Sequence, residues 1–236
     1  MALKNIHITI IVNGGVMVSQ GRVSLCVGWI TLFLMGTDLF VVSPLLPFIS
    51  EEYNVSPVMT GWMVTVFTVT YAIAAPFFGW VSDKKGRGIF ITFGLLLFSF
   101  SNALTAFSPS FTWLIISRIL AGLAVAAITP LIYAIIGDIA PSNRRGTWLS
   151  IVVSGHLTAL WAGAPIGTLL EHFLGWRSVF VVMAIIGTLL AVVNFKTWKD
   201  VPESNLTRNL IEGKLLRIIG SVSVTTIWAI SMYTLY

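Results

Sequence analysis

The chain has 236 residues, of which 56% are hydrophobic and 10% are charged. An average soluble domain is about 25% charged, so this composition excludes a soluble globular protein and predicts an integral membrane protein. The net charge of +5 at pH 7 requires no nucleic acid, provided that the basic residues gather on one side of a membrane. The single cysteine, Cys26, excludes internal disulfides and a cysteine-based metal cage, and we expect neither a metal nor a cofactor.

Six apolar segments are long enough to cross a hydrocarbon core of about 30 Å as helices of about 20 residues. A membrane β-strand would need about ten residues with alternating faces, and no such alternation is present. The sequence therefore predicts an all-α integral membrane fold. The expected spans are residues 24–49, 60–81, 89–107, 111–137, 147–170 and 178–195.

The segments outside these spans divide the chain into four parts. Residues 1–23 are predicted to be a cytoplasmic N-terminal tail, followed by a six-helix bundle over residues 24–195. Residues 196–217 are polar and include Pro202, which is typical of a linker. The apolar run over residues 218–236 predicts the start of a seventh spanning helix that is cut off, so we expect the sequence to be incomplete.

The charged residues predict the orientation in the membrane. If the six spans alternate in direction, the basic residues collect on one side, which is then cytoplasmic and contains the N-terminus. We expect the membrane to be the plasma (inner) membrane. The basic side carries Lys4, Arg22, Lys84, Lys85, Arg87, Arg144, Arg145, Lys196, Lys199, Arg208, Lys214 and Arg217, and the opposite side carries Glu51, Glu52, Glu171 and Arg177.

Three ionisable residues lie inside predicted spans, where a charge costs at least a few kcal/mol and therefore marks a functional candidate. Asp38, near the middle of the first span, can exchange a proton or pair with a cationic substrate. Arg118 lies about 10 Å inside the fourth span and stays charged, so it needs a partner. Both also have a purely structural interpretation. His156 in the fifth span is a weaker candidate for proton coupling, because a lone histidine more often makes a packing hydrogen bond.

The fifth span contains small residues at every fourth position: Gly155, Ala159, Gly163 and Gly167. This spacing predicts a face against which another helix packs closely. We place Pro165 within this stripe and expect it to bend the outer half of the helix. Tight packing without any further role is the alternative interpretation.

The loop between the second and third spans reads G-W-V-S-D-K-K-G-R-G over residues 79–88. The preference for basic residues on the cytoplasmic side explains its lysines and Arg87. It does not explain the glycines, which favour tight turns, or Asp83, which can cap a helix or form an ion pair.

This loop resembles the signature loop of the major facilitator superfamily, G-x-L-a-D-r-x-G-r-k, with Val81 in place of the usual leucine. The sequence R-I-L-A-G at residues 118–122 is similar to the family's fourth-helix pattern, R-x-x-q-G. Residues 163–168, G-A-P-I-G-T, are similar to its fifth-helix antiporter motif, and residues 36–47 resemble the first span of the drug:proton antiporter group with twelve helices. The resemblance covers about residues 25–196.

The resemblance implies the six-helix N-terminal half of a major facilitator superfamily fold, followed by the start of a seventh helix. It implies proton-coupled efflux, that is antiport, of drugs, sugars or other small solutes, with protons, a small-molecule substrate and the lipid bilayer as partners. The implied substrate and proton-coupling residues are Asp38, Arg118 and His156. The implied cytoplasmic gate comprises Gly79, Asp83, Gly86 and Arg87 with Asp138 as the ion-pair partner of Arg87, and the antiporter-motif helix carries Gly155, Ala159, Gly163, Pro165 and Gly167.

An alternative from another class is a truncated membrane fragment that does not transport, or a half-transporter that needs a C-terminal half or a second copy. We do not expect an intramembrane enzyme. The sequence has no His-Glu-x-x-His, no paired intramembrane aspartates and no Gly-x-Ser-x-Gly, which are the arrangements that such chemistry uses.

Overall fold

The structure, a computed structural model, describes the backbone of residues 2–198 and the side chains of residues 21–82 and 86–198. The predicted linker, apart from its first three residues, and the predicted seventh helix lie outside the described residues. The rest of the predicted domain organisation can be followed from the first helix onward.

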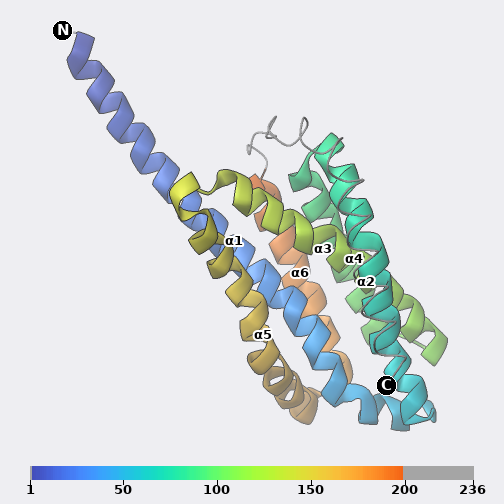
Figure 1. Cartoon of the computed structure of the whole chain (residues 1–236). Helices are drawn as coiled ribbons and strands as arrows, with labels where there is room; N and C mark the ends of the chain where they lie inside the picture. The colour runs from blue at the N-terminus through green and yellow to red at the C-terminus, as the bar shows by residue number, and fades with distance from the viewer. Residues whose placement is uncertain (1, 199–236) are drawn as a thin grey trace, which may run out of the picture. The chain divides into compact units, whose positions relative to one another are not determined.

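Six long α-helices form the described part of the chain (Figure 1), and each contains a stretch long and apolar enough to cross a membrane. The predicted all-α membrane fold with six spanning helices is therefore confirmed. The helices are α1 (Ala2–Tyr53), α2 (Pro57–Lys85), α3 (Arg87–Ala106), α4 (Phe111–Ile139), α5 (Arg145–Leu174) and α6 (Trp176–Trp198), with a short 3₁₀ helix, η1 (Ser142–Arg144), before α5.

The first helix is longer than the sequence predicts. α1 begins at Ala2 rather than near Ser24, and its apolar stretch covers Gly21–Tyr53. No proline precedes Pro44, so nothing in the covalent backbone forces the helix to start later. The predicted tail is thus helical, and its place on the cytoplasmic side stays a prediction.

Tight connections join neighbouring helices. Ser56 caps α2 by accepting a hydrogen bond from the Met59 amide at 3.3 Å. Gly86, with φ 90°, separates α2 from α3, and Gly175, with φ 77°, separates α5 from α6. Side chains other than glycine rarely adopt such positive φ values, so these two turns depend on glycine.

The small-residue stripe of α5 packs along α1, and the two helices lie side by side (Figure 1). A Cβ atom added at Gly155 would lie 2.4 Å from the Trp29 carbonyl oxygen, and one at Gly167 would lie 1.8 Å from Cγ2 of Val41. A larger residue at either position would collide, so the predicted close approach of a neighbouring helix is present here.

Pro165 does not belong to this stripe, which corrects the sequence prediction. Gly163 and Gly167 are buried against α1, whereas Pro165 is exposed within the continuous helix α5. The reason is geometric: each residue turns an α-helix by about 100°, so a residue midway between two stripe positions faces the opposite side.

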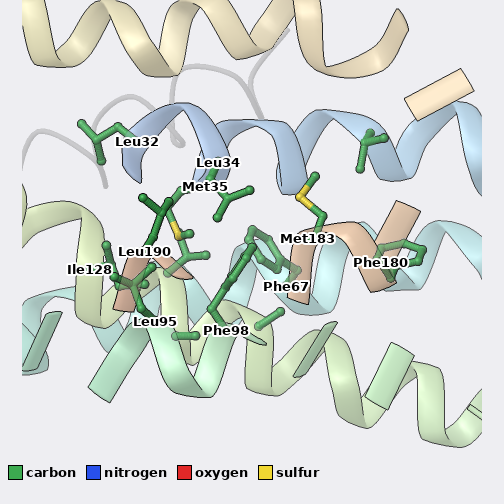
Figure 2. Packing of buried hydrophobic residues seen from close by; sticks show 14 of the residues in the cluster. Leu32, Leu34, Met35, Phe67, Leu95, Phe98, Ile128, Phe180, Met183 and Leu190 are labelled. Carbon is green, nitrogen blue, oxygen red and sulfur yellow. The ribbon is translucent and has the colours of Figure 1, made fainter. Parts of the chain in front are cut away.

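The core lies between α1, α3, α4 and α6. Figure 2 shows Leu34 and Met35 of α1 directed toward Leu95 of α3, Ile128 of α4 and Leu190 of α6, and all five are buried. Lipid tails are as apolar as these side chains, so the stabilisation comes from van der Waals packing rather than from removal of water.

We expect the substitution Gly155→Ala to destabilise the bundle by about 1–3 kcal/mol, because the new methyl group would press on the backbone of α1. The measurement is thermal unfolding of the purified chain in detergent. The matched control is Gly146→Ala in the same helix, where an added Cβ meets no atom within 4 Å. Equal unfolding midpoints for the two variants would contradict the close α1–α5 packing.

Candidate functional site

The two ionisable residues singled out in the first and fourth spans meet inside the bundle. Asp38 of α1 and Arg118 of α4 are 0% and 1% exposed, and Nη1 of Arg118 lies 3.3 Å from Oδ2 and 3.4 Å from Oδ1 of Asp38. Each charge therefore supplies the partner that the other needs in a low-dielectric interior.

Arg118 has two further contacts. Its Nη2 donates a hydrogen bond to Oγ1 of Thr105 on α3 at 2.8 Å, and its guanidinium carbon lies 5.1 Å from the centre of the Phe180 ring on α6. Thr105 Oγ1 also lies 2.8 Å from Oγ of Ser117 and 2.9 Å from the carbonyl oxygen of Ser101. Helices α1, α3, α4 and α6 thus all contribute to one buried polar centre.

Asp38 and Arg118 are both enclosed by the six-helix unit in this conformation, and their part in substrate binding and proton coupling stays a prediction. An ionisable residue in a span normally indicates contact with water or substrate. Here the ion pair satisfies both charges within the protein. A proton, unlike a bulky solute, is small enough to react at such a site.

His156 of α5 packs beside Gly36 and Phe40 of α1, which are close to Asp38 in sequence. It is half-buried on α5, and its ring centroid lies 6.3 Å from that of Phe40 in an edge-on arrangement. A Cβ added at Gly36 would lie 3.4 Å from Cγ of His156, so the histidine packs beside the turn of α1 that precedes Asp38. Its Nδ1 has no hydrogen-bond partner among the described residues.

The gating-loop residues lie at the opposite end of α3 from Thr105. Arg87, the first residue of α3, forms an ion pair with Asp138 near the end of α4, and Nη2 of Arg145 lies 3.5 Å from Oδ1 of Asp138. The structure thus contains the predicted contact between Arg87 and Asp138, and its action as a gate stays a prediction. An added Cβ at Gly79 would meet no atom within 4 Å, and the side chain of Asp83 lies outside those described.

A second polar cluster, which the sequence analysis did not predict, lies at the other end of the bundle. We call it the outer cluster, and it comprises Glu52, Tyr53, Ser108, Trp176 and Arg177. Glu52 forms an ion pair with Arg177 and accepts a hydrogen bond from Nε1 of Trp176 at 2.6 Å. The hydroxyl of Tyr53 donates to the Ser108 carbonyl at 2.8 Å and lies 2.9 Å from Nη2 of Arg177. The available signal was a pair of opposite charges, each next to an aromatic residue at a span end.

Six apolar helices around a buried ion pair define a multi-pass membrane protein. Residues 28–236 match the sequence profile of the Major Facilitator Superfamily. The chain therefore belongs to this superfamily, which is one of transporters rather than enzymes.

Individual relatives agree with this assignment. The chain is 28% identical over 205 residues to an uncharacterized MFS-type transporter, YbcL, of Bacillus subtilis (strain 168), covering 84% of this chain and 52% of that protein. It is 33% identical over 192 residues to multidrug resistance protein 1 of the same organism, covering 78% and 49% of the two chains. The chain thus spans about half the length of these relatives.

The fold is also similar to a solved structure. The crystal structure of the peptide transporter POT in complex with sulfate superposes with a TM-score of 0.67 at 17% sequence identity, covering 88% of this chain and 46% of that one. At this level of identity the likeness concerns the fold.

We expect Asp38→Leu and Arg118→Met each to destabilise the bundle by about 3–5 kcal/mol, because each leaves an unpaired buried charge. The double variant should be more stable than either single variant, since it removes both charges together. Thermal unfolding of the four proteins in detergent measures this cycle. Additive losses would show that the two side chains do not depend on each other.

Proposed function

We propose that this chain is the N-terminal six-helix unit of a proton-coupled transporter that exports small solutes across the plasma (inner) membrane. The observation that carries the proposal is the enclosed Asp38–Arg118 pair, which places a carboxylate inside the membrane-spanning part of a major facilitator protein. Asp38 is the group that takes up the proton, because Arg118 stays charged.

Proton binding changes the balance of contacts around Arg118. A proton that arrives from outside binds one carboxylate oxygen of Asp38 and makes the side chain neutral, which weakens its attraction to the guanidinium. Arg118 still has Thr105 and the face of Phe180 as partners. The charge on Asp38 therefore governs how firmly α1 is tied to α4, and release of the proton to the cytoplasm restores the pair.

The second element of the proposal is the cytoplasmic gate at the ends of α3 and α4. The ion pair between Arg87 and Asp138 joins these ends, and Arg145 at the start of α5 extends the contact. Closing and opening of this charged cluster would alternate with protonation of the buried pair, as expected when one helical unit rocks against another.

A complete transport pathway needs a second wall. In the most apolar stretch of each helix, 11% of the residues are buried in α2 and 22% in α5, compared with 61% in α1 and 67% in α4. We propose that the open faces of α2 and α5 meet a second six-helix unit, either a C-terminal half or a second copy of this chain. This observation favours the half-transporter alternative over a fragment without a role.

The export direction and the substrate class rest on resemblance. One relative is named multidrug resistance protein 1, and α5 carries the sequence similar to an antiporter motif, including Gly163, Pro165 and Gly167. We therefore propose drugs, sugars or other small solutes as the substrates, with His156 as a secondary candidate for proton coupling.

Efflux of a cationic dye from cells that express the chain tests the proposal. We expect efflux to depend on the proton gradient and to fall at least about tenfold in Asp38→Asn, which matches the shape of the carboxyl group but cannot ionise. The matched control is Glu51→Gln, which removes an exposed carboxylate from the same helix and should leave efflux unchanged.

Gradient-independent efflux, or full efflux by Asp38→Asn, would contradict proton coupling at Asp38. If the inserted chain gives no efflux alone but does so when a C-terminal half from a relative is co-expressed, the half-transporter proposal is supported. No efflux in either case, across a panel of cationic and neutral solutes, would favour a membrane fragment that does not transport.

Charge reversal tests the gate. Arg87→Asp alone should reduce transport strongly, because it places two carboxylates together, and combination with Asp138→Arg should restore part of the rate. The matched control is Arg144→Asp, which makes the same change of charge at a nearby exposed position. Equal losses in the single and double variants would contradict a gating ion pair.

A further inference from the structure

The outer cluster is connected to the buried ion pair by two independent chains of contact. One chain passes through hydrogen bonds at the end of α3, and the other passes through aromatic rings at the start of α6. Both chains end on Arg118.

The first chain runs through Ser108 and Thr105. The Ser108 carbonyl accepts hydrogen bonds from Tyr53 at 2.8 Å and from Arg177 at 3.1 Å. The Ser108 hydroxyl in turn donates to the carbonyl oxygen of Thr105 at 2.9 Å. The outer cluster therefore fixes the last turn of α3, from which the Thr105 side chain reaches Arg118.

The second chain runs through Trp176 and Phe180. Trp176 is held by Glu52, and its ring lies 5.9 Å from that of Phe180 in an edge-to-face arrangement. Phe180 is fully buried, and its face supports the guanidinium of Arg118 at 5.1 Å. Phe180, near the start of α6, thus packs against Arg118 and limits its movement.

The distances around Arg118 show which partner holds it most closely. Its bond to the neutral hydroxyl of Thr105 is 2.8 Å, whereas its contacts with the carboxylate of Asp38 are 3.3 and 3.4 Å. Charge-assisted hydrogen bonds of this kind are usually about 2.7–2.9 Å. Arg118 thus lies closer to Thr105, through Nη2, than to Asp38, through Nη1.

We propose that Thr105 and the outer cluster are positioning residues that set how readily Asp38 takes up a proton. By holding Arg118 back, they limit its stabilisation of the ionised carboxylate. The use of this effect in transport rests on the proposed function, whereas the effect on Asp38 itself does not. This positioning effect connects the exposed residues Glu52 and Arg177 to the buried centre.

Few other charged groups are near enough to obscure this effect. Arg118 of α4 contacts Asp38 directly, and His156 of α5 lies beside the preceding turn of α1. The spans of α2, α3 and α6 contain no Asp, Glu, Lys, Arg or His between their ends, although α2 and α4 carry the half-buried hydroxyls of Tyr71 and Tyr133.

Infrared difference spectroscopy of the purified chain in lipid nanodiscs tests the proposal without any transport assay. The Asp38 signal is the carboxyl band that is absent in Asp38→Asn, followed over about pH 4 to 9. In Thr105→Val, Arg118 loses its neutral acceptor, and we expect it to move toward Asp38. The pH at which the Asp38 band reaches half of its full intensity should then fall by about one unit, which is a tenfold change in proton affinity. Thr105→Ser retains the hydroxyl and should restore the original value.

The outer cluster is tested in the same way with Tyr53→Phe and Glu52→Gln, which should lower this pH by a smaller amount. Glu51→Gln is the matched control for the second variant, because it removes an equal charge from the adjacent position and its side chain makes no ion pair with any described residue. Unfolding temperatures measured on the same samples show whether each variant is folded.

The proposal would be overturned if folded Thr105→Val reached half of the Asp38 band intensity at the same pH as the original protein. It would also be overturned if Glu51→Gln shifted this pH as much as Glu52→Gln does. The absence of an Asp38 band over the whole range would overturn it as well, because the carboxylate would then never take up a proton. If these variants shift the pH as expected but Asp38→Asn retains full efflux, the positioning role stands and the proposed function is contradicted instead.

Discussion

The charge of Arg118 is the constraint on which the rest of the structure depends. A guanidinium remains ionised at any physiological pH, and here it is enclosed by apolar helices, so its partners have to come from the protein itself. Asp38, Thr105 and Phe180 meet this requirement from three other helices. The arrangement of α1, α3, α4 and α6 is thereby fixed around one point, and the apolar side chains fill the space around it.

The close packing of α1 and α5 places the segment around Asp38. Gly155 and Gly167 let the backbones approach where a Cβ atom would collide. This packing leaves one face of α1 for the interior, where Asp38 meets Arg118, and another for α5, where Gly36 and Phe40 meet His156. Small residues therefore determine which way the carboxylate of Asp38 points.

Polar clusters at the two ends of the bundle have different connections to this centre. The ion pair of Arg87 and Asp138 joins the ends of α3 and α4 at the gating loop. The outer cluster instead reaches Arg118 through Ser108 and Thr105. Under the proposed function, a unit tied together in this way would move as a body during alternating access between two helical units.

For the part of the chain that the structure describes, the sequence by itself determined that there are six spans and where they approximately lie, because the length of an apolar run and the placement of glycine and proline are local properties. It also identified Asp38 and Arg118, since a charge within an apolar run is conspicuous wherever the helix lies. It could not show that the two pair with each other and are enclosed, or that Glu52, Ser108 and Arg177 form one cluster. Those contacts join residues far apart in the chain, and only the tertiary structure decides which helix faces meet.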